Sequence, residues 1–192
     1  EVMIDEYQDS NYVQETLLTA VSGVKNGREN LFMVGDVKQS IYRFRLARPE
    51  LFMEKYQHFS VEESSRQRID LHRNFRSRRE VVDAVNDIFY PLMGQDIGNV
   101  GYDAEAALYA GAVFPEYEKP ECCKPELLLV PMDGSSAERR EQEAFAVAGR
   151  IRQMIDAQQI PGLELKDIVI LLRSMSGWAE VYQNVFEQEG IP

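Results

Sequence analysis

Cysteine is scarce in this sequence, and long apolar runs are absent. The two cysteines among 192 residues are the neighbours Cys122 and Cys123, which leaves no material for a disulfide framework. No Cys or His lies at ligand spacing from them, so a structural metal is not expected. No run approaches the roughly 20 apolar residues of a membrane-spanning helix. These absences predict a cytoplasmic protein without disulfides and without a membrane partner.

Lysine is also scarce, and no lysine lies in a phosphate-binding loop. Such a loop reads Gly-x-x-x-x-Gly-Lys-Ser/Thr, because its amides and its lysine hold the phosphates of a nucleotide. None of the six lysines follows Gly or precedes Ser or Thr. We therefore expect that this chain alone neither hydrolyses ATP nor binds it tightly.

Basic residues are outnumbered, but they are concentrated in one window. The net charge is −11, which by itself argues against a nucleic-acid partner. Residues 38–79, however, hold 11 of the 21 Lys and Arg against five acids, a local balance of +6. A basic zone on an acidic chain suits a protein that contacts phosphates at one place, although a solvated charged face has the same appearance.

Apolar runs alternate with helical patterns along the chain. Strands are predicted at 2–4, 31–34, 69–71, 127–130 and 168–172. Helices are predicted from a cap at Ser10 or Asn11 to Gly27, from Pro49 to about Tyr56, from a Ser77–Glu80 capping box, from a Ser135–Glu138 capping box through Ile155, and from Trp178 to Gly190. This alternation predicts parallel βαβ units and an α/β fold.

Regular periodicity disappears between residues 95 and 125, where Gly, Pro and acids accumulate. The predicted organisation is a domain over 1–94, an irregular acidic linker over 95–125 and the opening of a second domain over 126–192. The sequence starts inside a predicted strand and stops directly after a predicted helix. We therefore expect it to be an internal piece of a longer protein.

Two adjacent acids, Asp5 and Glu6, follow the first apolar strand. The carboxyl ends of strands are where α/β folds place their ligands. In phosphoryl transfer one such acid can hold Mg²⁺ and the other can deprotonate water. Acids also end many ordinary strands, so this pair alone is a weak signal.

Three longer strings give that pair a context. Residues 4–11, Ile-Asp-Glu-Tyr-Gln-Asp-Ser-Asn, resemble motif II of superfamily 1 DNA helicases of the UvrD, PcrA and RecB type. Residues 34–45, Val-Gly-Asp-Val-Lys-Gln-Ser-Ile-Tyr-Arg-Phe-Arg, resemble their motif III, and residues 74–77, Asn-Phe-Arg-Ser, resemble motif IV. Within the superfamily, Val37-Lys38 and Arg45-Leu46-Ala47 look like the AddA group of helicase-nuclease proteins. The resemblance implies parts of two RecA-like motor domains, without the phosphate loop, motifs V and VI or the nuclease region.

The resemblance also implies roles for individual residues. Asp5 would coordinate Mg²⁺, Glu6 would activate water, and Gln39 would sense the γ-phosphate of ATP. Arg76 would act as an arginine finger in cis, and Phe75 would stack on the adenine. The predicted DNA-binding residues are Tyr42, Arg43, Phe44 and Arg45, with the two aromatic rings on one side of an extended segment.

Plainer interpretations exist for the same residues. Tyr42 and Phe44 fit equally well as core residues, which is the commoner fate of alternating aromatics. Arg76 fits as a partner of a surface acid, an interaction of little energy.

Three functions compete at this point. The leading one is a piece of an ATP-dependent 3′-to-5′ translocase that works on single-stranded DNA and double-stranded DNA ends in break repair and recombination, in a bacterial, nucleoid-associated setting with an AddB-like partner. The second is a non-catalytic interaction module of a DNA-repair complex. The third, a nucleotide-binding regulator, is disfavoured by the missing phosphate loop.

Overall fold

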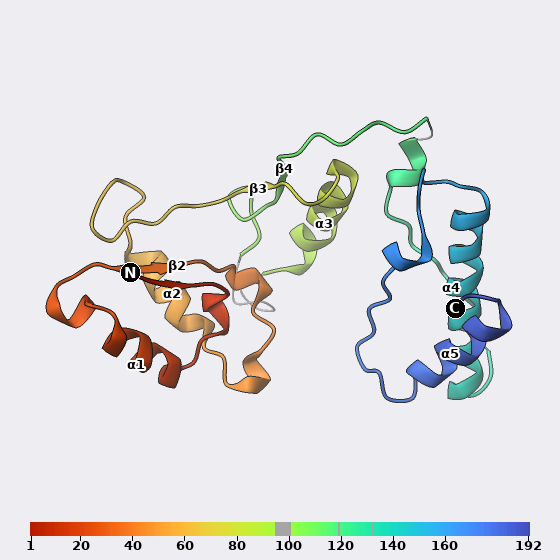
Figure 1. The fold of residues 1–192 in the computed structure, drawn as a ribbon, viewed down its shortest axis with the longest axis horizontal. Helices are drawn as coiled ribbons and strands as arrows, with labels where there is room; N and C mark the ends of the chain where they lie inside the picture. Colours follow the sequence, from red (N-terminus) through yellow and green to blue (C-terminus); the bar gives the residue numbers. More distant parts are fainter. Residues whose placement is uncertain (95–100, 119, 132) are drawn as a thin grey trace. The chain divides into compact units, whose positions relative to one another are not determined.

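The computed structural model describes residues 1–94, 101–118, 120–131 and 133–192 as two compact units (Figure 1). The first unit comprises Glu1–Asn74 and Val85–Tyr109, and the second comprises Phe75–Ala84 and Ala110–Pro192. Each unit is described by itself. The boundaries predicted at 94/95 and 125/126 stay predictions about the intact protein.

A parallel pair of short strands organises the first unit. Strand β1 (Val2–Ile4) pairs with β2 (Leu31–Met33), with Val2 opposite Leu31 and Ile4 opposite Met33. The ladder continues past both strands, since Val34 N–H donates to Ile4 O at 2.8 Å and Tyr7 N–H donates to Val34 O at 2.9 Å. Parallel strands require a crossover, and here it contains helix α1 (Tyr12–Val21) (Figure 1). The predicted βαβ unit is therefore present.

Helix α1 begins with a complete capping box. Asn11 Oδ1 accepts from the amides of Val13 and Gln14, while Gln14 Oε1 accepts from the amide of Asn11. The helix ends at Val21, earlier than the predicted end at Gly27, because the chain leaves the helix at Ser22 and forms the 3₁₀ turn η2 (Val24–Asn26). Gly27 ends that turn with φ 74°.

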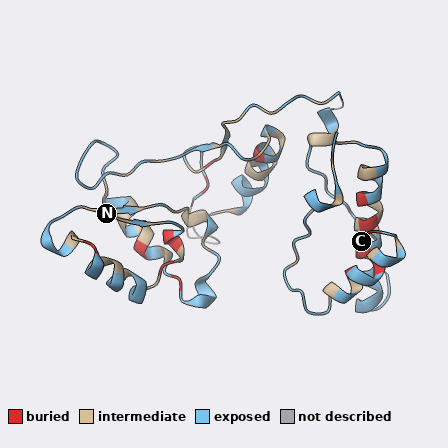
Figure 2. Ribbon diagram, in the orientation of Figure 1, coloured by how far each residue is buried: buried red, intermediate tan, exposed pale blue. Residues whose placement is uncertain are grey.

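Helix α2 (Pro49–His58) carries the small core of the first unit. Pro49 occupies its first turn, as predicted, where a missing N–H has no consequence. The helix packs against the 3₁₀ turns η1 (Tyr7–Asp9) and η3 (Val37–Gln39), so one helix supports both segments that follow the paired strands. Buried residues gather around these turns, whereas α1 is largely exposed and the strand pair is mostly half-buried (Figure 2).

Three further elements follow. Strand β3 (Arg73–Asn74) pairs with β4 (Tyr109–Ala110), and helix α3 spans Arg79–Leu92. With Ser77 as its N-cap the predicted helix would begin at Arg78, one residue before the observed start. In the first unit, Asn86 of α3 donates to Leu108 O at 2.8 Å and accepts from Tyr102 Oη at 2.7 Å. These two bonds hold the segment that contains Tyr102 and Leu108 against the helix.

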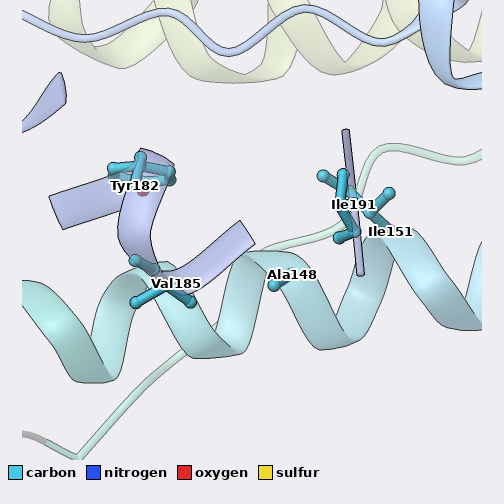
Figure 3. Close-up of a cluster of buried hydrophobic side chains, with 6 residues drawn as sticks. Ala148, Ile151, Tyr182, Val185 and Ile191 are labelled. Carbon is cyan, nitrogen blue, oxygen red and sulfur yellow. The ribbon is translucent and has the colours of Figure 1, made fainter. Parts of the chain in front are cut away.

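Two helices of different length build the core of the second unit. The 3₁₀ turn η5 (Pro120–Cys123) precedes helix α4 (Ser136–Asp156), and the 3₁₀ turn η6 (Leu165–Asp167) precedes helix α5 (Ala179–Gln188). The predicted capping box of Ser135 and Glu138 opens α4. Ala148 and Ile151 of α4 face Val185, Tyr182 and Ile191 (Figure 3). The small alanine side chains let α5 approach closely.

Three strand predictions are wrong. Residues 69–71, 127–130 and 168–172 are in no strand, although β3 forms two residues beyond the first of these ranges. Leu129 is 83% exposed and Leu171 is 90% exposed. A strand requires a hydrogen-bonded neighbour, and the described residues offer these segments none. The mixed α/β class holds, while the RecA-like assignment stays a prediction.

No helix in the described ranges combines the length and the apolar character that crossing a lipid bilayer requires.

The packing of α4 on α5 generates a stability prediction. Ala148 is fully buried against α5, whereas Ala137 is exposed on the same helix. Ala148→Leu adds volume to a filled interface and is expected to lower the free energy of unfolding by about 1–3 kcal/mol. Ala137→Leu is the matched control and should change it by less than about 0.5 kcal/mol. Urea unfolding followed by circular dichroism measures both, and equal effects would contradict the described core.

Candidate functional site

Asp5 and Glu6 lie directly after β1, at the carboxyl end of the parallel pair. Both side chains are exposed and line a shallow pocket together with Asp9 and residues of α1. Asp5 Oδ1 accepts from Glu6 N–H at 2.9 Å. The structure thus places the two predicted acids at one open edge, where a ligand can reach both.

Glu6 has an unusual backbone. Its φ of 51° and ψ of 41° are left-handed, a region that residues other than Gly, Asn and Asp seldom adopt. Such a conformation costs on the order of 1 kcal/mol and persists where neighbouring bonds impose it. Here the ladder bond from Tyr7 N–H to Val34 O fixes the residue that follows.

A buried network lies behind the acids. Tyr7 is fully buried, its hydroxyl donates to Glu15 of α1, and Lys55 of α2 meets the same carboxylate at 2.8 Å. The Lys55 ammonium also lies 5.0 Å from the centre of the Tyr7 ring. Burial, reinforced by the hydrogen bond to Glu15, raises the pKa of Tyr7 well above its ordinary value. These contacts connect α1 and α2 through the turn that carries the acids.

Gln8, which no sequence pattern singled out, connects the two strand ends. Its amide Nε2 donates to Glu6 Oε2 at 2.6 Å, and its Oε1 accepts from Asp36 N–H at 3.0 Å. Asp36 in turn accepts from Gln39 Nε2 at 3.1 Å. Gln39 is exposed, so of the predicted residues the structure brings Asp5, Glu6 and Gln39 to one side of the strand pair.

Asp9 is a further residue that sequence reasoning missed. Its Oδ1 is buried and has no hydrogen-bond partner within the described part of the chain. Burial, with a smaller effect of the Glu6 carboxylate, raises the pKa of Asp9. The signal available in the sequence was the position of Asp9, four residues after Asp5 and in the turn that follows strand β1.

The predicted DNA-binding residues form a 3₁₀ turn, η4 (Arg43–Arg45), which corrects the expectation of an extended segment. The ring centres of Tyr42 and Phe44 lie 5.9 Å apart. The Arg45 guanidinium lies 5.1 Å from the centre of the Tyr42 ring and 5.5 Å from the centre of the Phe44 ring. The turn forms because Leu46 adopts a left-handed conformation and Ala47 N–H donates a hydrogen bond to Tyr42 O. Phe44 is 75% exposed.

Two contacts fix where this turn lies. Arg43 reaches Glu50 of α2 at 3.3 Å, and Arg48 N–H donates to Ser10 O at 2.8 Å. Ser10 directly follows η1, so the aromatic turn is attached to the segment that carries the acids.

Phe75 and Arg76 belong to the second unit, whereas the acids belong to the first. Phe75 has an exposed ring, and Arg76 interacts within the chain. The predicted stacking of Phe75 on the adenine of ATP and the predicted contact of Arg76 with its γ-phosphate stay predictions.

The donors around Asp5 suit a magnesium nucleotide. In the ranges that the structure describes, no group of three or more His, Cys, Asp or Glu side chains is arranged to enclose a metal ion. Mg²⁺ needs no such cage, because it commonly takes one or two carboxylates and completes its shell with water and phosphate oxygens. Asp5, exposed at a strand end, has a carboxylate suited to coordination of this kind.

Comparison with known proteins agrees with these motifs. Residues 1–60 match the model of the UvrD/REP helicase N-terminal domain. The whole chain aligns at 44% identity with the AddA-type ATP-dependent helicase/nuclease protein of Lachnoclostridium phytofermentans and at 46% with that of Bacillus licheniformis, in each case over 17% of the relative. The Listeria innocua protein of the same name is 47% identical over 92% of the chain. The chain thus spans about a sixth of the relatives that it matches.

The left-handed conformation of Glu6 generates the prediction for this site. Glu6→Gly and Glu6→Ala both remove the side chain and its contact with Gln8, but only Gly adopts a positive φ without strain. Glu6→Gly should therefore be more stable than Glu6→Ala by about 1 kcal/mol. Urea unfolding of both variants measures the difference. If the Ala variant were equally stable, Glu6 would not hold this conformation in solution.

Proposed function

Because residues 1–60 belong to the UvrD/REP helicase N-terminal family and the whole chain matches AddA-type helicase/nuclease proteins, we propose that it carries part of the ATP site and DNA-contacting surface of such a protein. The observation that carries the proposal is the pair of acids at the carboxyl end of β1, joined through Gln8 and Asp36 to Gln39. The intact protein would be an ATP-dependent helicase and nuclease for DNA ends in break repair and recombination, working with an AddB-like partner.

The proposed division of labour follows from the chemistry of each side chain. Magnesium-bound ATP supplies the phosphoryl group whose transfer to water drives the motor. Asp5 holds the metal, and the carboxylate of Glu6 accepts the proton of the attacking water. Gln39 is neutral, so it contacts a phosphate oxygen without competing for the metal. In the intact protein Arg76 acts as an arginine finger, because its planar guanidinium can stabilise charge that develops on the phosphoryl oxygens.

The aromatic turn supplies the proposed contact with single-stranded DNA. Tyr42 and Phe44 present π-faces that stack on any base, and Arg43 and Arg45 attract the phosphate backbone. The exposure of the Phe44 ring and its attachment beside the acids support this role. Because Gln39 lies five residues before Phe44, one short segment reads both the phosphate and the DNA.

The first test concerns Glu6 in the intact protein. Glu6→Gln keeps the size of the side chain but cannot accept a proton, so ATP turnover is expected to fall by about 10²–10⁴-fold. Affinity for ATP should change little. Phosphate release and binding of a fluorescent nucleotide measure the two quantities, with the exposed Glu63→Gln as the matched control. Turnover within a few-fold of wild type would remove Glu6 from the proposed role.

The second test separates DNA stacking from packing at Phe44. In the intact protein Phe44→Ala should weaken binding of oligo-dT and oligo-dA similarly, by roughly 5- to 150-fold, because stacking contributes about 1–3 kcal/mol per base. Phe44→Trp keeps an aromatic face and should bind nearly as wild type. A packing role predicts instead a loss of about 3–5 kcal/mol of stability. A large drop in melting temperature with unchanged DNA affinity would reject the stacking role.

A further inference from the structure

Gln8 is a buried polar residue with contacts in two motif segments. Gln8 is 1% exposed, and in the sequence it lies between the two acids and helix α1. Its carboxamide bonds Glu6, two residues before it, and the amide of Asp36, 28 residues after it. A buried polar group without partners is costly, so both bonds are needed for Gln8 to occupy this position.

The two partners fix the orientation of the carboxamide. A carboxylate only accepts hydrogen bonds, so Glu6 requires the NH₂ group of Gln8. The backbone N–H of Asp36 only donates, so it requires the oxygen. Reversing the amide would place oxygen against oxygen and N–H against N–H. Gln8 therefore holds Glu6 and Asp36 in one fixed relation.

Gly35 provides the space for this connection. A Cβ atom there would lie 2.6 Å from Gln8 Oε1, 3.2 Å from Phe52 Cε2 and 3.3 Å from the backbone nitrogen of Gln8. The backbone after β2 thus approaches Gln8 so closely that a Cβ at this position would displace the Gln8 carboxamide.

The connection continues from Asp36 to Gln39. Asp36 Oδ1 accepts from Lys38 N–H at 3.0 Å and from the Lys38 ammonium at 2.9 Å. Asp36 Oδ2 accepts from Gln39 Nε2 at 3.1 Å, and Gln39 N–H donates to Asp36 O at 2.9 Å. A single series of bonds therefore runs from the carboxylate of Glu6 through Gln8 and Asp36 to the side chain of Gln39.

We propose that Gln8 is a positioning residue that orients the Glu6 carboxylate and couples it to the turn formed by Asp36–Gln39. The inference rests on the proposed function, in which Glu6 accepts the proton of water and Gln39 contacts the γ-phosphate. A movement of Gln39 toward phosphate shifts Asp36, and Gln8 transmits that shift to Glu6. DNA bound at the neighbouring aromatic turn would act on turnover through the same bonds.

The chemistry of an amide suits this task. A neutral N–H donor orients a carboxylate without giving it a proton and without neutralising it, so Glu6 stays a base. A lysine here would form an ion pair and lower the basicity of Glu6. A glutamate would place two carboxylates 2.6 Å apart, where they cannot both be ionised without strong repulsion.

That last contrast gives a test in the intact protein. Gln8→Glu keeps the size of the side chain and the acceptor for Asp36, but it replaces the NH₂ group that donates to Glu6 with a second acceptor. The bond to Glu6 is then lost while the bond from Asp36 N–H is kept. The variant should therefore lower kcat by about 10²-fold. The KM for ATP should stay within a few-fold.

Two more variants isolate the cause. Gln8→Met removes both bonds, so its kcat should also fall by about 10²-fold with little change in KM. Gly35→Ala displaces the Gln8 carboxamide from the other side and should lower kcat and DNA stimulation in the same way. Gly101→Ala is the matched control, because a Cβ there meets no atom within 4 Å.

The outcomes separate this inference from the proposed function. If Glu6→Gln retains turnover, the proposed function fails, whatever the Gln8 variants do. If Glu6→Gln abolishes turnover but Gln8→Glu keeps the kcat of wild type, the inference about Gln8 alone is overturned. It is also overturned if the Gln8 and Gly35 variants lose kcat only in proportion to the folded fraction seen by circular dichroism, since that loss indicates packing.

Discussion

The parallel pairing of β1 with β2 is the constraint on which the candidate site depends. It sets Ile4 opposite Met33, so the residues after both strands leave the ladder at the same edge. The bond from Tyr7 N–H to Val34 O carries the pairing one step further and forces the left-handed turn at Glu6. Only in this register does Gln8 reach Asp36. A slip of one residue would separate the acids from the Gln39 turn.

The uncovered apolar surface has a related cause. Helix α1 buries none of its residues, and Leu17, Val21 and Phe32 are all exposed. An amphipathic helix and a two-stranded sheet are marginal unless another layer covers them. The relatives that match this chain are about six times its length, so the chain corresponds to part of a larger assembly of elements.

The sequence predicts those features that local chemistry determines. The Ser135 box and Pro49 act within one turn, so α4 and α2 begin where expected. The strand errors arise because pairing depends on residues remote in sequence, which an apolar run cannot specify. Around the site, the acids were predictable from their position and from the helicase-like motifs. The Tyr7–Glu15–Lys55 network was not, because its members look like ordinary helix and turn residues and meet only in the fold.

Gln8 and Glu6 occupy positions that local stability does not favour for their residue types. One is a buried polar residue where burial favours an apolar one, and the other has a positive φ where glycine is favoured. Each departs from what stability alone selects, and each contacts the other. The hydrogen bonds that stabilise Gln8 in its buried position include the bond that orients Glu6. The ladder bond from Tyr7 N–H to Val34 O fixes both the left-handed turn at Glu6 and the position of Gln8 after it. Stability and positioning therefore rest on the same few bonds, so a substitution at this edge must be judged by kcat and KM together with folding.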